Sequence, residues 1–111
     1  MLNFYFFFNN VVAIQEAAKD DNTEMIYILL KSIGEELTSR LFYECQTLTQ
    51  IAIPPNIKSI GFQAFSYCKS LKSIFIPSSV TSIGDNSFNC CPALTKIKIP
   101  PLVKSIEKCS F

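Results

Sequence analysis

The sequence repeats every 23 residues over its C-terminal half, and this fixed period constrains the fold more than any other feature. Residues 51–73 and 74–96 are two complete repeats, and residues 97–111 are a third that stops part-way. Residues 41–48 match residues 64–71, which places a degenerate repeat at about residues 28–50. The recurring positions are Ile51, Ile74 and Ile97; Ile53, Ile76 and Ile99; Pro54, Pro77 and Pro100; Ile57, Val80 and Val103; Ser59, Ser82 and Ser105; Ile60, Ile83 and Ile106; and Phe65, Phe88 and Phe111.

Each repeat is expected to form one coil with two short extended pieces. The alternation around Ile74 and Ile76 predicts a strand whose side chains point alternately into and out of the core. Pro77 ends it, because proline lacks the N–H that a further ladder bond needs. After the second piece, Gly84 is expected to permit a sharp change of direction before a half-turn of helix at 87–91. Glu107 takes this place in the third repeat, where a positive φ would cost about 1 kcal/mol.

A single coil cannot bury its own apolar side chains, so successive coils must stack with like residues in continuous inward columns. Phe65 and Phe88 are expected to form one such column. A second column is expected from the three cysteines spaced 23 residues apart, Cys45, Cys68 and Cys91, as buried thiols. Cys90 and Cys109 fall at positions expected to be exposed. The repeats therefore predict an α/β-type solenoid, a short stack of parallel strands.

The N-terminal third predicts helices rather than strands. Residues 11–33 carry a helical apolar pattern interrupted by a turn at residues 20–22, with Thr23 as the expected N-cap of the second helix. A helical hairpin would cap the exposed end of the stack. We therefore expect a capping segment at 1–33 and repeats at 34–111. The apolar opening, residues 1–14, lacks a basic residue and fits a buried or amphipathic segment better than a secretory signal or a membrane span.

Two strings carry a resemblance to a known family. IPSSVTSIGDNSF at residues 76–88 and IPPNIKSIGFQAFSYCKSLKSI at residues 53–74 resemble the BspA-like leucine-rich repeats, and the resemblance covers about residues 41–111. It implies a curved parallel solenoid and, for several members of the family, a role in adhesion or cell-surface binding. It implies no reaction, and no catalytic or ligand-binding residue transfers with it.

The composition argues against an enzyme. The chain has no histidine, which removes the usual general base and imidazole metal ligand. It also lacks a CxxC pair and a glycine-rich phosphate loop, so we expect no catalytic residue, metal or cofactor and no small-molecule substrate. Five cysteines, an odd number, favour a reducing compartment, although the choice between cytoplasm and cell surface stays open.

The outward positions of the predicted strands form the candidate binding surface. Phe75 is the one large aromatic expected in the open there, bordered by lysines, as in an interaction hot spot; alternatively, it only packs against the lysine stems. The charge is uneven: residues 1–50 hold three basic and seven acidic side chains, and residues 51–111 hold seven Lys against Asp85 and Glu107. The predicted partner-binding residues are Gln50, Ala52, Lys72, Ser73, Phe75, Lys96 and Lys98.

Three functions fit these features. The first is a protein-binding or adhesion module whose partner is another protein, of a host or of a cell surface. The second is binding of a polyanion, a glycosaminoglycan or, less favoured, a nucleic acid, through the lysines. The third is a structural spacer within a longer repeat protein. The sequence stops at Phe111 in the middle of a coil, and we expect it to be a fragment.

Overall fold

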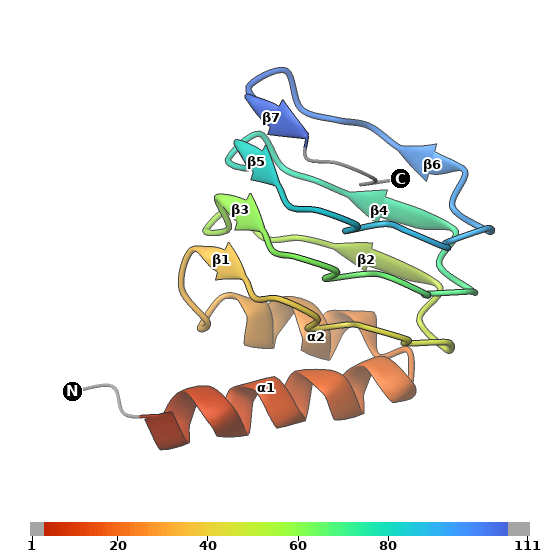
Figure 1. The fold of residues 1–111 in the computed structure, drawn as a ribbon. Coiled ribbons are helices and arrows are strands. Elements are labelled where there is room, and N and C mark those ends of the chain that lie inside the picture. The colour runs from red at the N-terminus through yellow and green to blue at the C-terminus, as the bar shows by residue number, and fades with distance from the viewer. Residues whose placement is uncertain (1–3, 107–111) are drawn as a thin grey trace.

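The computed structural model describes residues 4–106, which form two helices followed by a stack of coils (Figure 1). The helices α1 (Phe4–Lys19) and α2 (Thr23–Leu30) lie at one end of the stack. The strands are β1 (Glu36–Leu37), β2 (Gln50–Ala52), β3 (Ser59–Ile60), β4 (Ser73–Phe75), β5 (Ser82–Ile83), β6 (Lys96–Ile97) and β7 (Ser105–Ile106). This arrangement confirms the predicted α/β-type solenoid with an N-terminal helical cap.

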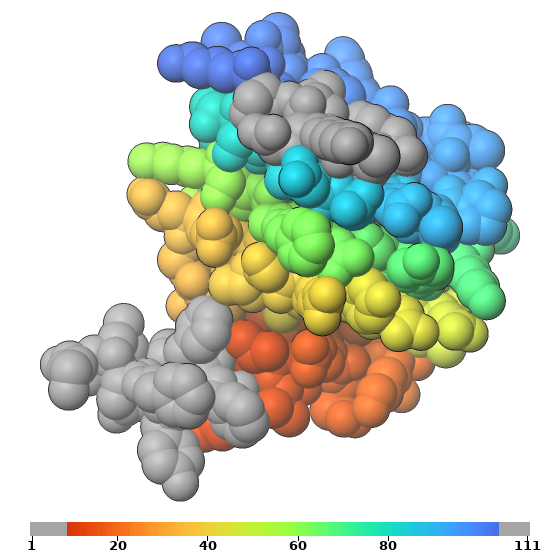
Figure 2. Space-filling model, viewed as in Figure 1, coloured from red at the N-terminus to blue at the C-terminus, as the bar shows by residue number. Residues whose placement is uncertain are grey.

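The strands form two parallel sheets; the first coil contributes β1 alone, and each of the next three coils contributes one strand to each sheet. The first sheet has the order β1-β3-β5-β7 and the second has the order β2-β4-β6. Ile51 pairs with Ile74, and Ile74 pairs with Ile97, so the register advances by one sequence period at each coil. Figure 2 shows the same order as successive layers of colour from the helices to the last coil. The 23-residue period is therefore one turn of the solenoid.

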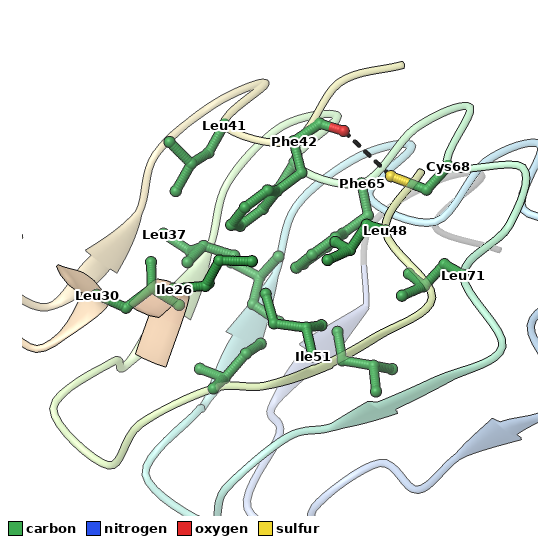
Figure 3. Packing of buried hydrophobic residues seen from close by; sticks show 14 of the residues in the cluster. Ile26, Leu30, Leu37, Leu41, Phe42, Leu48, Ile51, Phe65, Cys68 and Leu71 are labelled. Carbon is green, nitrogen blue, oxygen red and sulfur yellow. Dashed lines mark hydrogen bonds between the residues drawn. The ribbon is translucent and has the colours of Figure 1, made fainter. Parts of the chain in front are cut away.

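The core consists of the predicted columns of like side chains. The rings of Phe42 and Phe65 stack with their centroids 5.2 Å apart, and those of Phe65 and Phe88 stack at 5.4 Å. The Cys68 thiol is buried beside them and donates a hydrogen bond to the Phe42 carbonyl oxygen at 3.1 Å (Figure 3). One coil further, the Cys91 thiol donates in the same way to the Phe65 carbonyl at 3.0 Å. Each thiol thus ties its coil to the one before it.

Only Cys68 of the cysteine column is fully buried. Cys45 and Cys91 are half-buried, so the prediction of three core thiols is too strong for these two positions. Cys90 is exposed, as predicted, because its position in the coil faces outward. Phe111, Cys109 and Glu107 lie outside the described residues.

The turns of the coils differ from the expectation in two ways. Gly61 and Gly84 do not have a positive φ; among the described glycines only Gly34 does. These two are glycines because successive coils approach closely: a Cβ at Gly61 would lie 2.7 Å from the Leu37 carbonyl oxygen. Residues 87–90 form turns rather than a half-turn of helix, since Cys90 takes the left-handed conformation with φ 58°.

Apart from Asp21, the left-handed non-glycine residues of the described chain recur at two positions in three successive coils. They are Arg40, Gln63 and Asn86 at the first position and Glu44, Tyr67 and Cys90 at the second. The backbone N–H of Gln63 donates to the Asp85 carbonyl at 3.0 Å, and that of Tyr67 donates to the Asn89 carbonyl at 2.8 Å. These bonds join successive coils where no strand is present, and they offset the cost of about 1 kcal/mol for a non-glycine residue in this conformation.

The helical cap replaces part of the degenerate first repeat. Helix α2 packs beside β2, in the place where the next strand of that sheet would lie. Its N-cap is Asn22 and not the predicted Thr23: the Asn22 side chain accepts from the Met25 N–H at 3.2 Å. Helix α1 begins at Phe4, earlier than the predicted residue 11. No helix within residues 4–106 has the length and apolar character needed to cross a bilayer.

Asp21, in the turn between the helices, fixes the cap to the first coil. Its carboxylate accepts hydrogen bonds from the Thr49 N–H at 3.0 Å and the Thr49 hydroxyl at 2.6 Å. Ile14, Ile26 and Leu30 are fully buried against the coils and extend the same hydrophobic core. The cap therefore contributes both apolar area and directed hydrogen bonds to the end of the stack.

Candidate functional site

The outer face of the sheet β2-β4-β6 forms the floor of a shallow hollow of about 900 Å³, which we call the sheet-face hollow. The alternation of buried and exposed residues along β2 and β4 creates it: Ile51 and Ile74 point into the core, and their neighbours point out. Six of the predicted binding residues line the hollow, namely Gln50, Ala52, Ser73, Phe75, Lys96 and Lys98. Lys72 is exposed but does not line it.

Phe75 is the most prominent apolar side chain of this face. Its side chain is 63% exposed, whereas Phe65 of the core column is fully buried. It also lines a second, smaller hollow of about 290 Å³ with Pro100 and Pro101. Most of the ring is therefore accessible, and a partner that covered it would remove a large apolar surface from water.

Helix α2 supplies a wall that the sequence prediction missed. Thr23, Glu24, Tyr27 and Ile28 line the hollow together with the strands. Ile28 is 59% exposed, although it belongs to an apolar run. The signal in the sequence was the surplus of apolar residues in TEMIYILL, since a helix of this length buries only one stripe of side chains.

The charges of the hollow are separated along the stack. Lys96 and Lys98 lie at the last coil, and Glu24 lies on α2 at the opposite end. The ion pairs within the described part of the chain are Lys19–Glu16 at 3.2 Å and Lys58–Glu35 at 3.0 Å, and neither lies in the hollow. The three charged groups are thus available to a partner.

The thiols lie away from this face. Cys91 lines a separate hollow with Tyr67, Phe88 and Leu94. With both thiols protonated, each donates to the carbonyl oxygen of the preceding coil. When Cys91 loses its proton, the Cys68 thiol can donate to the Cys91 thiolate instead; this hydrogen bond lowers the pKa of Cys91 to about 7, and together with burial it raises the pKa of Cys68. Cys91 is therefore the more reactive thiol of the pair, but within residues 4–106 no histidine or carboxylate lines the hollow beside it to act as a general base.

Comparison with protein families places the chain. The model of the BspA type leucine rich repeat region matches residues 2–111 in six copies. The chain belongs to this BspA-type leucine-rich repeat family. The resemblance seen in residues 41–111 is therefore confirmed, and the match also extends over the N-terminal helices.

Three solved structures are similar to this BspA-type chain. A leucine-rich repeat protein of T. pallidum is 29% identical, with a TM-score of 0.63 over 65% of this chain and 34% of that one. One from Bacteroides ovatus is 37% identical, with a TM-score of 0.63 over 64% and 18% of the two chains. A leucine rich cell surface protein of Faecalibacterium prausnitzii is 34% identical, with a TM-score of 0.54 over 65% and 20%.

The chain spans about a third or less of the length of these three proteins. A search of the curated proteins finds no match. Leucine-rich repeat proteins are generally interaction or surface modules, and the fold is typically non-catalytic. These comparisons give the family and the general class of function, and they name no partner.

Proposed function

We propose that this BspA-type repeat protein is a non-catalytic module that binds another protein through the sheet-face hollow. The observation that carries the proposal is the 63% exposed Phe75 on the middle strand of the sheet that forms the floor of this hollow. Large exposed apolar side chains in a hollow are typical of interaction sites, and aromatic anchors supply much of the binding free energy. Residues 1–33 would then both cap the stack and, through α2, complete the binding surface.

The proposed protein partner is favoured over a polyanion by the position of the charges. Among the described residues, Lys96 and Lys98 are the two that bring positive charge to the hollow, and Glu24 opposes them from α2. Lys58, on another surface, is paired with Glu35. A polyanion site needs a continuous row of unpaired cations that neutralises several phosphates or sulfates. The similar structure from F. prausnitzii is that of a cell surface protein, which supports a surface or adhesion role for this chain.

Selection from a phage-displayed library of random peptides tests the proposal. Peptides that bind the native chain should lose at least about ten-fold in affinity for Phe75→Ala, the loss typical of a binding hot spot. The matched control is Leu102→Ala, which truncates another exposed apolar side chain that does not line the hollow and should leave the affinity unchanged. Phe75→Ala should also keep its free energy of unfolding within about 0.5 kcal/mol of the native value.

Two outcomes contradict the proposal. The first is a set of selected peptides that binds Phe75→Ala as tightly as the native chain. The second is a loss of stability on Phe75→Ala comparable with that of a core phenylalanine, which would make Phe75 a packing residue. An affinity that falls about a hundred-fold or more between about 50 and 200 mM salt would instead favour the polyanion.

A further inference from the structure

We infer that the partner is an extended peptide segment that lies across the coils, with an apolar centre over Phe75 and an acidic end over Lys96 and Lys98. The inference rests on the proposed function and specifies the partner of the same hollow. It starts from the order of residues along the two outward columns of the sheet β2-β4-β6.

Both columns change from uncharged to basic in the same direction. In the first column Gln50 pairs with Ser73, and Ser73 pairs with Lys96. In the second column Ala52 pairs with Phe75, and Lys98 follows one period later. Because Lys96 and Lys98 both belong to the last coil, their two ammonium groups lie at one end of the face. A partner with carboxylates at that end gains two ion pairs.

The opposite end of the hollow has the opposite charge. Glu24 on α2 stands there beside the exposed Ile28, and neither it nor the two lysines forms an ion pair within residues 4–106. An acidic segment laid in the reverse sense would place its carboxylates against Glu24 and leave the lysines unpaired. The charge separation therefore specifies the orientation of the acidic end and disfavours a uniformly acidic segment.

The apolar groups extend from α2, where Ile28 lies beside Glu24, to β4 in the middle of the sheet. Ile28, Ala52 and Phe75 contribute them from α2, β2 and β4 respectively. The distance from the helix to β6 is about 10 Å for helix-to-strand packing plus two strand spacings of about 4.8 Å, or about 20 Å. An extended chain rises about 3.3 Å per residue, so about six residues span the hollow.

At Phe75 a partner can contact the face of the sheet but not a free strand edge. Strand β4, which carries Phe75, is already paired on one side with β2 and on the other with β6. A partner at Phe75 therefore cannot add a strand through main-chain hydrogen bonds, and it is recognised by side chains. The affinity should therefore depend on the order of side chains in the peptide, with acidic residues first, then apolar ones, then uncharged ones. It should not depend on main-chain hydrogen bonds.

Two fluorescein-labelled probe peptides, acetylated and amidated at their ends, test the inference by fluorescence anisotropy. The acidic probe has two glutamates, then phenylalanine and leucine, then two serines, and the basic probe has lysines in place of the glutamates. At about 50 mM salt the native chain should bind the acidic probe more tightly, by up to about 25-fold, since each of the two exposed ion pairs gives up to about a five-fold gain. High salt should reduce this difference, because screening weakens exposed ion pairs.

Reversing the charge of chosen lysines tests which of them cause the preference for the acidic probe. The double variant Lys96→Glu with Lys98→Glu should prefer the basic probe, whereas the control double variant Lys69→Glu with Lys104→Glu has the same net charge and should keep the native preference. Phe75→Ala should weaken both probes. Carbodiimide coupling of the acidic probe to the native chain, followed by mass spectrometry, should join the glutamates to Lys96 or Lys98.

The failures of the inference and of the proposed function are distinguishable. If both probes bind equally and depend on Phe75, the charge order is wrong and the protein-binding function stands. If the control double variant reverses the preference as fully as the variant in the hollow, net charge rather than position decides and the inference fails. If neither probe binds at millimolar concentration, the inferred occupant is wrong. The affinity of the phage-selected peptides for Phe75→Ala then tests the proposed function separately.

Discussion

Replacing Gly61 by alanine should destabilise the protein strongly, although the change adds only one methyl group. The Cβ would lie 2.7 Å from the Leu37 carbonyl oxygen and 2.8 Å from the Ser39 nitrogen, where ordinary contact begins at 3.4 Å. Both neighbours are backbone atoms of the preceding coil, so no side chain can move aside. The two coils must separate locally by about 0.7 Å, the difference between 3.4 and 2.7 Å.

The same separation breaks a hydrogen bond. The Gly61 N–H donates to the Leu37 carbonyl oxygen at 2.7 Å, and lengthening by about 0.7 Å takes it beyond a useful distance. The lost bond costs about 1 kcal/mol, and overpacking of this kind costs about 1–3 kcal/mol. We therefore expect Gly61→Ala to lower the free energy of unfolding by about 2–4 kcal/mol. Gly84→Ala should cost less, because its nearest contacts are at 3.0 Å.

Urea denaturation followed by circular dichroism measures these losses. Gly61→Asn separates two reasons for a glycine at this position, the close approach of the coils and a positive φ. Asparagine tolerates a positive φ but carries a Cβ, so it should be at least as destabilising as alanine. A loss below about 0.5 kcal/mol for Gly61→Ala, or recovery of stability with asparagine, would refute the close approach of the coils as the reason for the glycine.

Three further predictions concern the core, the thiols and the cap. Phe65→Ala should lower the free energy of unfolding by about 3–5 kcal/mol in urea titration, because it removes the central ring of the stack; a loss near 1 kcal/mol would contradict this. In a Cys90→Ser background, the rate at which iodoacetamide alkylates Cys91 should rise with pH through a midpoint of about 7, because this is the lowered pKa of the thiol. A midpoint near 9 would show that Cys68 does not stabilise the Cys91 thiolate. The unfolded chain has an ordinary thiol pKa at this position, so between about pH 7 and 9 it binds more protons than the folded chain. Cys91 therefore increases the free energy of unfolding as pH rises through that window. Asp21→Ala should cost about 2–3 kcal/mol, because it removes both hydrogen bonds to the first coil and puts alanine at a positive φ of 51°. A thermal melt indistinguishable from the native one would show that the cap does not depend on these bonds.

The repeat in the sequence predicted most of the fold because a constant period fixes distances. Once Ile51 and Ile74 occupy equivalent places in successive coils, the stacking of Phe65 on Phe88 follows without further information. The outward position of Phe75 follows from strand alternation in the same way. The use of these outward residues for binding is a different matter and stays a prediction.

The features that sequence reasoning missed depend on tertiary contacts. Nearly every residue of α2 is apolar, so the pattern does not tell that Ile26 faces the core and Ile28 faces the hollow. The packing of the helix against β2 decides this. Gly61 presents the same difficulty, because a glycine required by a close neighbour and one required by a positive φ look alike in a single sequence.

The equal register of the two sheets has a consequence for how such a protein changes in length. Ile51 with Ile74 and Ile60 with Ile83 are both one period apart, so a duplicated or deleted unit of 23 residues leaves every surviving contact in place. A loss of one residue inside a coil would instead turn the next strand over and expose its isoleucines. Genes of this kind can therefore gain or lose length only in whole units, and each added unit lengthens the binding face by about 4.8 Å.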